Sequence, residues 1–278
     1  MQPTVVVDAD DERLDDYRAL NDQRFRRAFE GDRLFVAEGL VSVERLLESG
    51  HEIRSVLLAP ARVERFAPHL PRVAADGAPV YVAEPDVIAA VVGFDLHRGV
   101  VAVAKRRPPA TLADVIGQAT RIAVLEGLND PENLGAIARA AKAFAIDALI
   151  LDPTCTDPYS RRTVRVSMGE VLTMPVVRVE DTAAAMGALH GSGFETWAMT
   201  PAADADDLWS LHAPSRVAVM LGAEGPGLRA ATIGAARRRV RIPIVDDVDS
   251  LNVGHAAAVT FAELARADRR HLGNSSPS

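Results

Sequence analysis

In the chain after residue 111, short apolar segments alternate with longer stretches whose apolar residues recur at helical spacing. The apolar segments have the length and the nearly continuous hydrophobicity of strands buried on both faces. They comprise Arg121–Leu125, Ala148–Leu151, Val176–Val179, Glu195–Met199, Val217–Leu221 and Val240–Ile244. Strands of this kind joined by helices are typical of a mostly parallel sheet with helices on both sides. We therefore predict an α/β domain in this part of the chain.

The first part of the chain shows a similar but less regular alternation. Strand-like runs and helical patterns occur at Leu34–Val36, Val41–Leu47, Ser55–Leu58, Val80–Ala83, Asp86–Val91 and Gly99–Val103. Arg106–Thr111 follows, with two adjacent prolines that can continue neither a helix nor a central strand. The pattern predicts two α/β domains, residues 15–105 and 112–272, joined by a linker at 106–111. Residues 1–14 and 273–278 are expected to be flexible tails.

Composition restricts the class of protein. The chain has 278 residues, of which 48% are hydrophobic, and no apolar run reaches the ~18 residues of a membrane span. The N-terminus is acidic where a secretory signal would be basic and then apolar. Cys155 is the only cysteine, which excludes an internal disulfide and a cysteine-based metal cluster. We expect a globular cytoplasmic protein without a membrane segment.

The net charge of −7 argues mildly against nucleic-acid binding, but a local basic surface is sufficient for such binding. The basic residues are clustered at Lys105–Arg107, at Arg161–Arg165 and at Arg237–Arg241. Each cluster taken singly is typical of a solvated face. Three clusters in an acidic chain make that interpretation less convincing.

The segment Glu126–Arg139 contains a well-marked helix start, because Asp130 can cap the helix and Pro131 suits its first position. One apolar stripe at helical spacing consists of Leu134, Ile137, Ala138, Ala141 and Phe144. Arg139 points away from this stripe. Its neighbours on the far face are small: Ala136, Ala140 and Ala143. An arginine among alanines suggests close approach by another surface and a specific partner for Arg139; the alternative is a surface arginine on an alanine-rich helix.

A glycine-rich segment, Leu221–Leu228, directly follows the strand predicted at Val217–Leu221. Glycines after a strand let a ligand approach the backbone, whose amide groups can bind it. The spacing fits neither the dinucleotide-binding nor the phosphate-loop fingerprint. A tight turn leading into the next helix is the alternative.

A third segment, Ile242–Ala258, runs from the end of the last predicted strand through an acidic loop into an alanine-rich helix. Ser250 or Asn252 can cap this helix through its side-chain oxygen. Capping alone explains either residue taken singly.

Together and in order, the three segments resemble the sequence motifs of the SpoU/TrmH ribose methyltransferases of the SPOUT superfamily. The matching residues are Asn133, Gly135 and Arg139 in motif one, Gly222, Glu224, Gly225 and Gly227 in motif two, and Ser250–Val253 in motif three. Ser167–Gly169 resembles an intermediate family signature. The resemblance covers about residues 121–264. The first domain is similar to the L30e-like, RNA-binding module of this family, through Phe35–Gly39 and His97–Val100.

The resemblance implies features that residue spacing could not show. The C-terminal sheet would carry a deep trefoil knot, a very rare feature. The protein would be a homodimer, with Arg139 entering the site of the partner subunit. The cofactor would be S-adenosylmethionine, and its expected contacts are Leu221, Gly222, Gly225, Ile242 and Leu251.

The implied reaction is methylation of a ribose 2′-hydroxyl in structured RNA. The enzyme must align oxygen, methyl and sulfur and help the proton leave, and no metal is needed. An arginine is a poor base, so we expect Arg139 to stabilise a developing alkoxide or to grip a phosphate. The residues expected to orient the ribose and Arg139 or to support the site are Asn133, Glu224, Ser250 and Asn252.

The motif-three loop departs from the family pattern. Where many relatives carry glycine, this chain has Asp246, followed by Asp247 and Asp249. Carboxylates beside an RNA backbone would be repulsive, so the loop either turns away or contacts the amino group of the cofactor.

Two other classes of protein compete with the methyltransferase. One is an RNA-binding protein that has lost catalysis on the same scaffold, and the complete set of motif residues argues against that loss. The other is a nucleotide-dependent oxidoreductase, which the missing dinucleotide fingerprint disfavours. The L30e-like module favours ribosomal over transfer RNA. The sequence identifies neither the nucleotide nor a housekeeping or antibiotic-resistance role.

Overall fold

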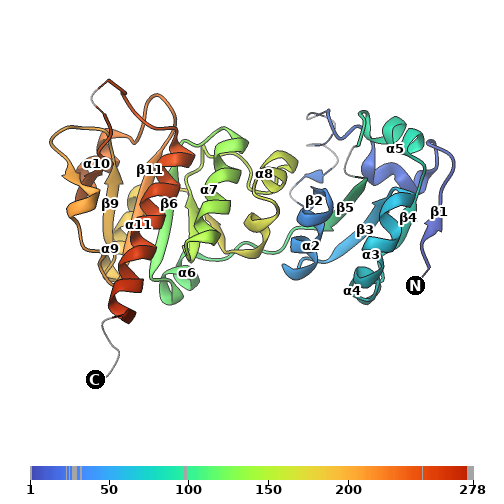
Figure 1. Cartoon of the computed structure of the whole chain (residues 1–278), viewed down its shortest axis with the longest axis horizontal. Helices are drawn as coiled ribbons and strands as arrows, with labels where there is room; N and C mark the ends of the chain where they lie inside the picture. The colour runs from blue at the N-terminus through green and yellow to red at the C-terminus, as the bar shows by residue number, and fades with distance from the viewer. Residues whose placement is uncertain are drawn as a thin grey trace. The chain divides into compact units, whose positions relative to one another are not determined.

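The computed structural model describes residues 2–22, 24, 26, 30–31, 33–96, 99–245 and 247–273. The chain divides into two compact units (Figure 1). The first unit contains residues 1–108 and 159–173, and the second contains residues 109–158 and 174–278. The boundary between Pro108 and Pro109 lies inside the segment expected to be a linker. No helix in the described ranges is both long and apolar enough to cross a membrane.

The first unit is built on a five-stranded mixed sheet in the order β1-β4-β3-β5-β2. Its strands are β1 (Thr4–Val5), β2 (Leu34–Glu38), β3 (Ile53–Leu58), β4 (Val80–Val82) and β5 (Val100–Lys105). β1, β4 and β3 are parallel, whereas β5 runs antiparallel to β3 and β2. Its α-helices are α2 (Leu40–Glu48), α3 (Val63–Phe66), α4 (Leu70–Ala75), α5 (Pro85–Val92) and α8 (Arg161–Val166). Short 3-10 helices are η1 (Glu12–Tyr17), η2 (Pro60–Arg62), η3 (Ala67–His69) and η4 (Glu170–Thr173).

The expected flexible tail at residues 1–14 is wrong for the described part of that segment. Strand β1 pairs with β4, and the side chains of Val6 and Leu14 are buried in the core of the first unit. Tyr17, just after this segment, donates a 2.6 Å hydrogen bond to Ser55. These apolar residues order the N-terminus because their burial removes them from water. The expected tail at 273–278 lies outside the described residues apart from Gly273, where α11 ends.

Residues 159–173 were expected in the second domain, but they pack as part of the first unit. The carboxylate of Glu38, only 4% exposed, forms ion pairs with Arg161 at 2.8 Å and with Arg165 at 3.6 Å. A buried carboxylate requires such partners. In the intermediate signature, Gly169 has a φ of +82°, and an added Cβ would lie 2.7 Å from the Cβ of Arg45. The glycine therefore permits this tight packing. His97 and Arg98 of the L30e-like match lie outside the described residues.

The second unit contains the predicted α/β domain with a parallel sheet, which is confirmed. Its seven strands are all parallel, in the order β10-β12-β9-β11-β6-β7-β8. They are β6 (Arg121–Glu126), β7 (Ala148–Leu151), β8 (Val176–Arg178), β9 (Glu195–Met199), β10 (Asp206–Asp207), β11 (Val217–Gly222) and β12 (Arg238–Arg241). The helices are α6 (Leu112–Gln118), α7 (Pro131–Ala143), α9 (Thr182–Gly191), η5 (Leu208–Ser210), α10 (Ala230–Ala235) and α11 (Val253–Gly273).

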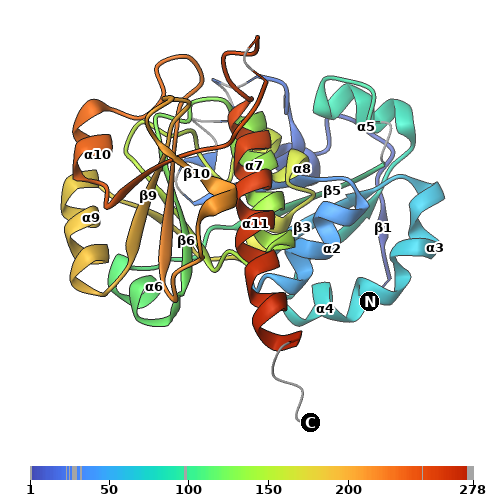
Figure 2. The ribbon, with the colours of Figure 1, turned by 60° about the vertical axis from the view of Figure 1, so that its left-hand side comes forward.

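Helices cover both faces of this sheet (Figure 2). Helices α6, α9 and α10 enclose one hydrophobic core, and α7 and α11 lie side by side on the opposite face. An added Cβ on Gly254 of α11 would be 3.3 Å from the Cβ of Ala136 on α7, so small residues permit the close approach of these two helices. The strand predicted at Val240–Ile244 is instead Arg238–Arg241. Pro243 has no N–H group to donate to a sheet, which explains the early end.

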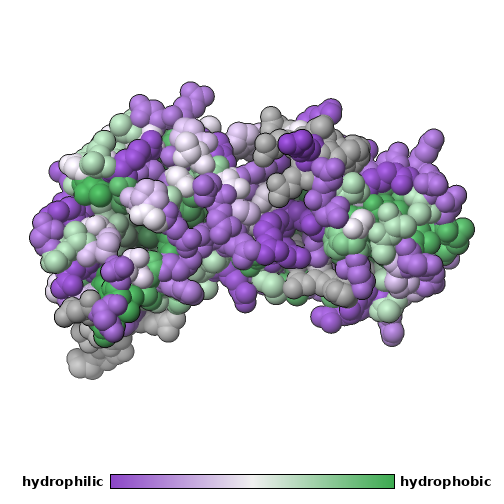
Figure 3. All heavy atoms as spheres, turned by 90° about the horizontal axis from the view of Figure 1, so that it is seen from above, coloured by the Kyte–Doolittle hydropathy of each residue, from purple (hydrophilic) through white to green (hydrophobic). Residues whose placement is uncertain are grey.

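Most large apolar side chains are buried, and hydrophilic residues cover much of the face shown in Figure 3. The exposed large hydrophobic residues of the second unit are Trp209, Val245, Val248 and Leu251. Three of these four belong to the segment between β12 and α11. That segment borders the cavity described next.

Candidate active site at the carboxyl edge of the parallel sheet

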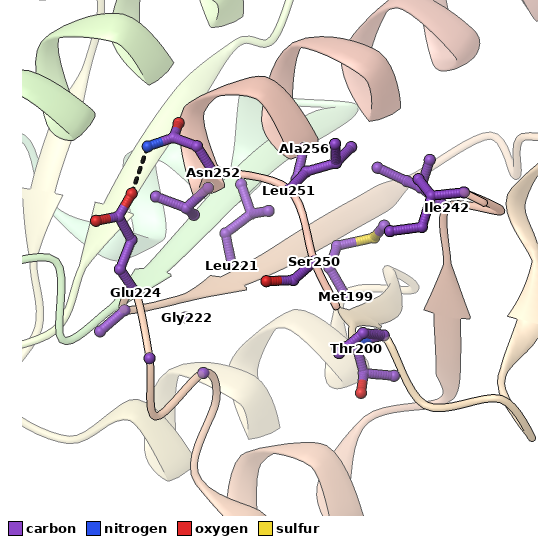
Figure 4. Close-up of a pocket in the computed structure, with 16 residues that line it drawn as sticks. Met199, Thr200, Leu221, Gly222, Glu224, Ile242, Ser250, Leu251, Asn252 and Ala256 are labelled. Atoms are coloured by element: carbon purple, nitrogen blue, oxygen red, sulfur yellow. Dashed lines mark hydrogen bonds between the residues drawn. The ribbon is translucent and has the colours of Figure 1, made fainter. Parts of the chain in front are cut away.

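A cavity of about 350 Å³ opens at the carboxyl edge of the second unit's sheet (Figure 4). Its walls come from the ends of β9 and β11, from the segment after β12 and from the first turn of α11. Ligands of open parallel sheets bind at this edge, and the volume is that of a small-molecule site.

All five residues predicted to contact a cofactor line this cavity: Leu221, Gly222, Gly225, Ile242 and Leu251. Three of the five predicted catalytic residues also line it: Glu224, Ser250 and Asn252. The hydroxyl of Ser250 points into the cavity (Figure 4). Segments that are about 20 residues apart in sequence therefore form one site.

Sequence reasoning missed part of the lining. The missed residues include Met199, Thr200, Pro201, Ile244, Val253 and Ala256. Met199–Pro201 lie at the end of a strand that the hydrophobic pattern did predict. The rule that ligands bind at the carboxyl ends of parallel strands could have identified them.

The side-chain amide of Asn252 connects the three motif segments. Its Nδ2 donates to Oδ1 of Asn133 at 3.0 Å and to the carboxylate of Glu224. Its Oδ1 accepts from the backbone N–H of Gly254 at 2.8 Å and so caps α11. The capping role and the site role, weighed above as alternatives, belong to the same side chain. Asn133, at 8% exposure, reaches the site through Asn252 rather than by lining the cavity.

Arg139 does not line the cavity of its own chain. It is exposed on α7, as are Ala136 and Ala143, while Ala140 is half-buried. The opposite stripe of α7 is buried, as its spacing predicts. Within the described ranges, Arg139 has no ion pair, so its guanidinium is available to another molecule.

The glycine at position 222 is required by its own loop. An added Cβ there would overlap the backbone carbon of Gly227 and the backbone nitrogen of Leu228. The loop folds back on itself, and Gly227 N–H donates to the carbonyl of Ala223 at 3.0 Å. Gly225 differs, because its φ is +83° but no atom lies near an added Cβ. The loop thus presents its backbone to the cavity.

A buried charge cluster fixes the far end of this loop. The backbone N–H of Arg229 donates to Glu126 at 2.5 Å, and its guanidinium contacts Glu126 at 3.0 Å and Asp152 at 3.2 Å. The side chains of Glu126 and Asp152 are 3% and 1% exposed. Burial favours the neutral form of Asp152, but hydrogen bonds from Gly127, Thr154 and Cys155 outweigh burial and lower its pKa. The cluster connects the ends of β6 and β7 to α10.

Each of the two units matches a known protein-family model. Residues 120–262 match the model of the SpoU rRNA Methylase family, and residues 36–110 match the model for RNA 2′-O ribose methyltransferase substrate binding. The first match spans more than half of the chain. The chain belongs to the SpoU rRNA methylase family. The predicted family and the enzyme class, RNA methyltransferase, are confirmed.

Individual relatives agree with this family. An uncharacterized tRNA/rRNA methyltransferase of Mycobacterium tuberculosis is 43% identical over 272 residues, which cover 96% of this chain and 93% of the relative. A 23S rRNA (guanosine-2′-O-)-methyltransferase of Nitrosomonas europaea is 35% identical over 69% of this chain and 75% of its own. The crystal structure of an AdoMet-bound rRNA methyltransferase from Sinorhizobium meliloti is similar with a TM-score of 0.80 and 29% identity, covering 98% of this chain and 99% of that one.

The structure places part of the acidic loop, Asp246–Asp249, for which a departure from the family pattern was expected. Asp247 and Asp249 are exposed, and neither lines the cavity. Asp246 lies outside the described residues. Of the two explanations given above for the carboxylates, a loop that turns away agrees with the placement of Asp247 and Asp249.

Gly222→Ala should destabilise the second unit by about 1–3 kcal/mol, because the added methyl group overlaps backbone that cannot rotate away. Gly234→Ala on α10 is the matched control, since its added Cβ meets open space at an ordinary backbone angle and should not destabilise the unit. Urea unfolding of both variants measures the difference. Equal stability of Gly222→Ala and wild type would contradict the loop geometry.

Asp152→Asn should lower the free energy of unfolding at neutral pH by about 1–3 kcal/mol, because an amide oxygen accepts the hydrogen bonds of Gly127, Thr154 and Cys155 more weakly than a carboxylate does. The native pKa of Asp152 is lowered, so its stabilisation is present above the unfolded pKa of about 3.9 and is lost as the pH falls through the native value. The gap between wild type and variant should therefore narrow below about pH 4. Exposed Glu180→Gln is the control, and a gap independent of pH would contradict the assignment.

Proposed function

We propose that the chain transfers a methyl group from S-adenosylmethionine to a ribose 2′-hydroxyl of structured RNA, with ribosomal RNA as the favoured substrate. The observation that carries this proposal is the cavity at the carboxyl edge, where Asn252 joins residues from all three motif segments. The S. meliloti protein of similar fold is named as an AdoMet-bound rRNA methyltransferase, and the N. europaea relative as a 23S rRNA 2′-O-methyltransferase.

The cavity fits the cofactor chemically. Leu221, Ile242 and Leu251 offer apolar walls for the adenine ring, and the glycine loop offers backbone groups that can recognise polar edges. Gly222, Gly225 and the other cofactor candidates named above remain proposed contacts. When bound, S-adenosylmethionine supplies a methyl group already activated by its sulfonium.

The residues of the chain then have to orient the hydroxyl and stabilise charge. Ser250 presents its hydroxyl to the cavity and can hold the ribose, while Glu224 is fixed by Asn252. Asn133 supports Asn252 from α7. Arg139 stabilises the developing alkoxide or holds the adjoining phosphate, since its guanidinium stays charged. Proton loss then follows to water or to a carboxylate such as Glu224.

The trefoil knot and the L30e-like fold of the first unit are part of the same proposal. A deep trefoil knot would form from the motif-two and motif-three segments, which share one cavity. The first unit, residues 1–108 and 159–173, would be the L30e-like substrate-binding module, and the second unit would be the SPOUT domain. The cytoplasmic location stays a prediction.

We further propose a homodimer in which Arg139 acts in the partner's site. Arg139 is exposed and lies outside its own cavity, and the surrounding face of α7 consists of small residues that permit close packing.

Sedimentation equilibrium at micromolar concentration should therefore give twice the chain mass. Ala140→Glu should shift the equilibrium to monomer, because a carboxylate would be buried without a partner. Lys142→Glu on the same helix controls for the added charge. A stable monomer of the wild type would contradict the dimer.

Arg139→Ala should reduce methyl transfer to RNA by about 10²–10³-fold, because a stabiliser of transition-state charge is removed. Affinity for S-adenosylmethionine should change less than about 2-fold, since Arg139 lies outside the cavity wall; calorimetry measures this, and radiolabel transfer measures the rate. Arg139→Lys should recover only part of the rate. If the cofactor affinity falls as much as the rate, Arg139 is a cofactor residue. If the wild type binds cofactor and RNA without transfer, the chain is a non-catalytic RNA binder.

A further inference from the structure

A second groove, of about 580 Å³, lies on the second unit between β12 and α10. One wall carries three consecutive arginines, Arg237, Arg238 and Arg239, and the other carries Asp204 and Asp206. Its floor consists of small residues of α10, and an added Cβ on Gly234 there meets open space. We call this surface the arginine groove. Among the described residues, no side chain fills it.

The arginines are held by carboxylates that are themselves in solvent. Arg239 contacts Asp204 at 2.8 Å, and Arg238 contacts Asp206 at 2.7 Å and the less exposed Glu195 at 2.9 Å. Asp204 and Asp206 are 70% and 48% exposed. Ion pairs this exposed contribute little to stability, because water and salt screen them. Another anion can therefore replace either aspartate at little cost.

Arg237 has no carboxylate partner within the described ranges. Its side chain is exposed, and its backbone N–H is held by Thr196 at 2.9 Å. The field of Arg237 reaches the nearby His190, where burial and this positive charge lower the histidine pKa. The groove thus contains Arg237 without an ion pair, Arg239 held by one exposed aspartate, and Arg238 held by two carboxylates. Arginine forks match phosphate oxygens in geometry as well as in charge.

The groove adjoins the candidate active site along the chain. Thr200 and Pro201 line the cofactor cavity, and Asp204 and Asp206 of the same loop line the arginine groove. On the other wall, β12 leads from Arg239 to Ile242 of the cavity within three residues. An extended polyanion bound in the groove would therefore run towards the reacting end of the sheet.

We propose that the arginine groove binds the phosphodiester backbone of the substrate RNA, and that Asp204 and Asp206 occupy the arginines until RNA displaces them. The proposed function supplies the identity of the polyanion, and the groove supplies its binding site on the methyltransferase unit. The two aspartates act as internal competitors of the phosphates. Removal of arginines and removal of aspartates should therefore change RNA affinity in opposite directions.

The test compares the full-length variants R237Q/R239Q and D204N/D206N with wild type. Binding of a fluorescently labelled RNA hairpin is titrated at several salt concentrations. R237Q/R239Q should bind about 10-fold more weakly, with the slope of log affinity against log salt reduced by about 1 for each lost contact. D204N/D206N should bind several-fold more tightly, a gain that misfolding cannot produce. Cofactor affinity, measured by calorimetry, should stay unchanged in both.

The Glu263–Arg266 pair on α11, whose side chains are 13% and 42% exposed, supplies the controls. E263Q and R266Q each change the charge by one unit away from the groove, half the change of the double variants, and should leave RNA affinity within about 2-fold of wild type. If E263Q also bound RNA more tightly, the gain seen for D204N/D206N would be an effect of net charge, and the proposed role of the groove would be wrong. Unchanged or weaker binding by D204N/D206N would also overturn it. A wild-type chain that binds cofactor but no RNA would instead contradict the proposed function itself.

Discussion

The amide of Asn252 is the contact on which the candidate site depends. Its two hydrogens are directed to Asn133 and Glu224, and its oxygen caps α11. A side-chain amide offers two N–H donors and an accepting oxygen in one planar group. A carboxylate, a hydroxyl or a positively charged side chain could not make all of these hydrogen bonds. One residue therefore fixes the start of α11, the first turn of α7 and the glycine loop relative to one another. The cavity lies between the segments that this amide joins.

Backbone geometry and buried carboxylates also hold the glycine loop that Asn252 contacts. Gly222 lets the loop close on its own backbone, and Arg229 anchors the end of that loop to the buried carboxylates of Glu126 and Asp152. These contacts lie on the side of the sheet covered by α9 and α10, while Asn252 acts from α7 and α11. The glycine loop is thus held from both faces of the sheet. Such support keeps a binding loop ordered before its ligand arrives, which reduces the entropy lost on binding.

The acidic character of the chain and its proposed RNA substrate are compatible because charge is local. The carboxylates of the motif-three loop, where described, are outside the cavity, and those of the arginine groove are paired with arginines. Net charge governs long-range repulsion, but affinity for a phosphate is set by the few guanidinium groups within contact distance. In this way, an acidic methyltransferase can restrict RNA binding to the surfaces where guanidinium groups gather.

Most helices and strands and all the motif residues can be predicted from the amino-acid pattern alone. Apolar periodicity located most strands of the second unit and the buried stripe of α7, and all five cofactor candidates line one cavity. These features are local or are repeated along the chain, so they can be read without knowing what packs on what. The packing of distant segments was needed to show that Asn252 both caps a helix and bridges the motifs, and that Met199–Pro201 share the cavity. It also placed Val6 and Leu14 in a core and residues 159–173 beside Glu38. Each of these depends on partners far apart in sequence, and spacing along the chain contains no information about such distances.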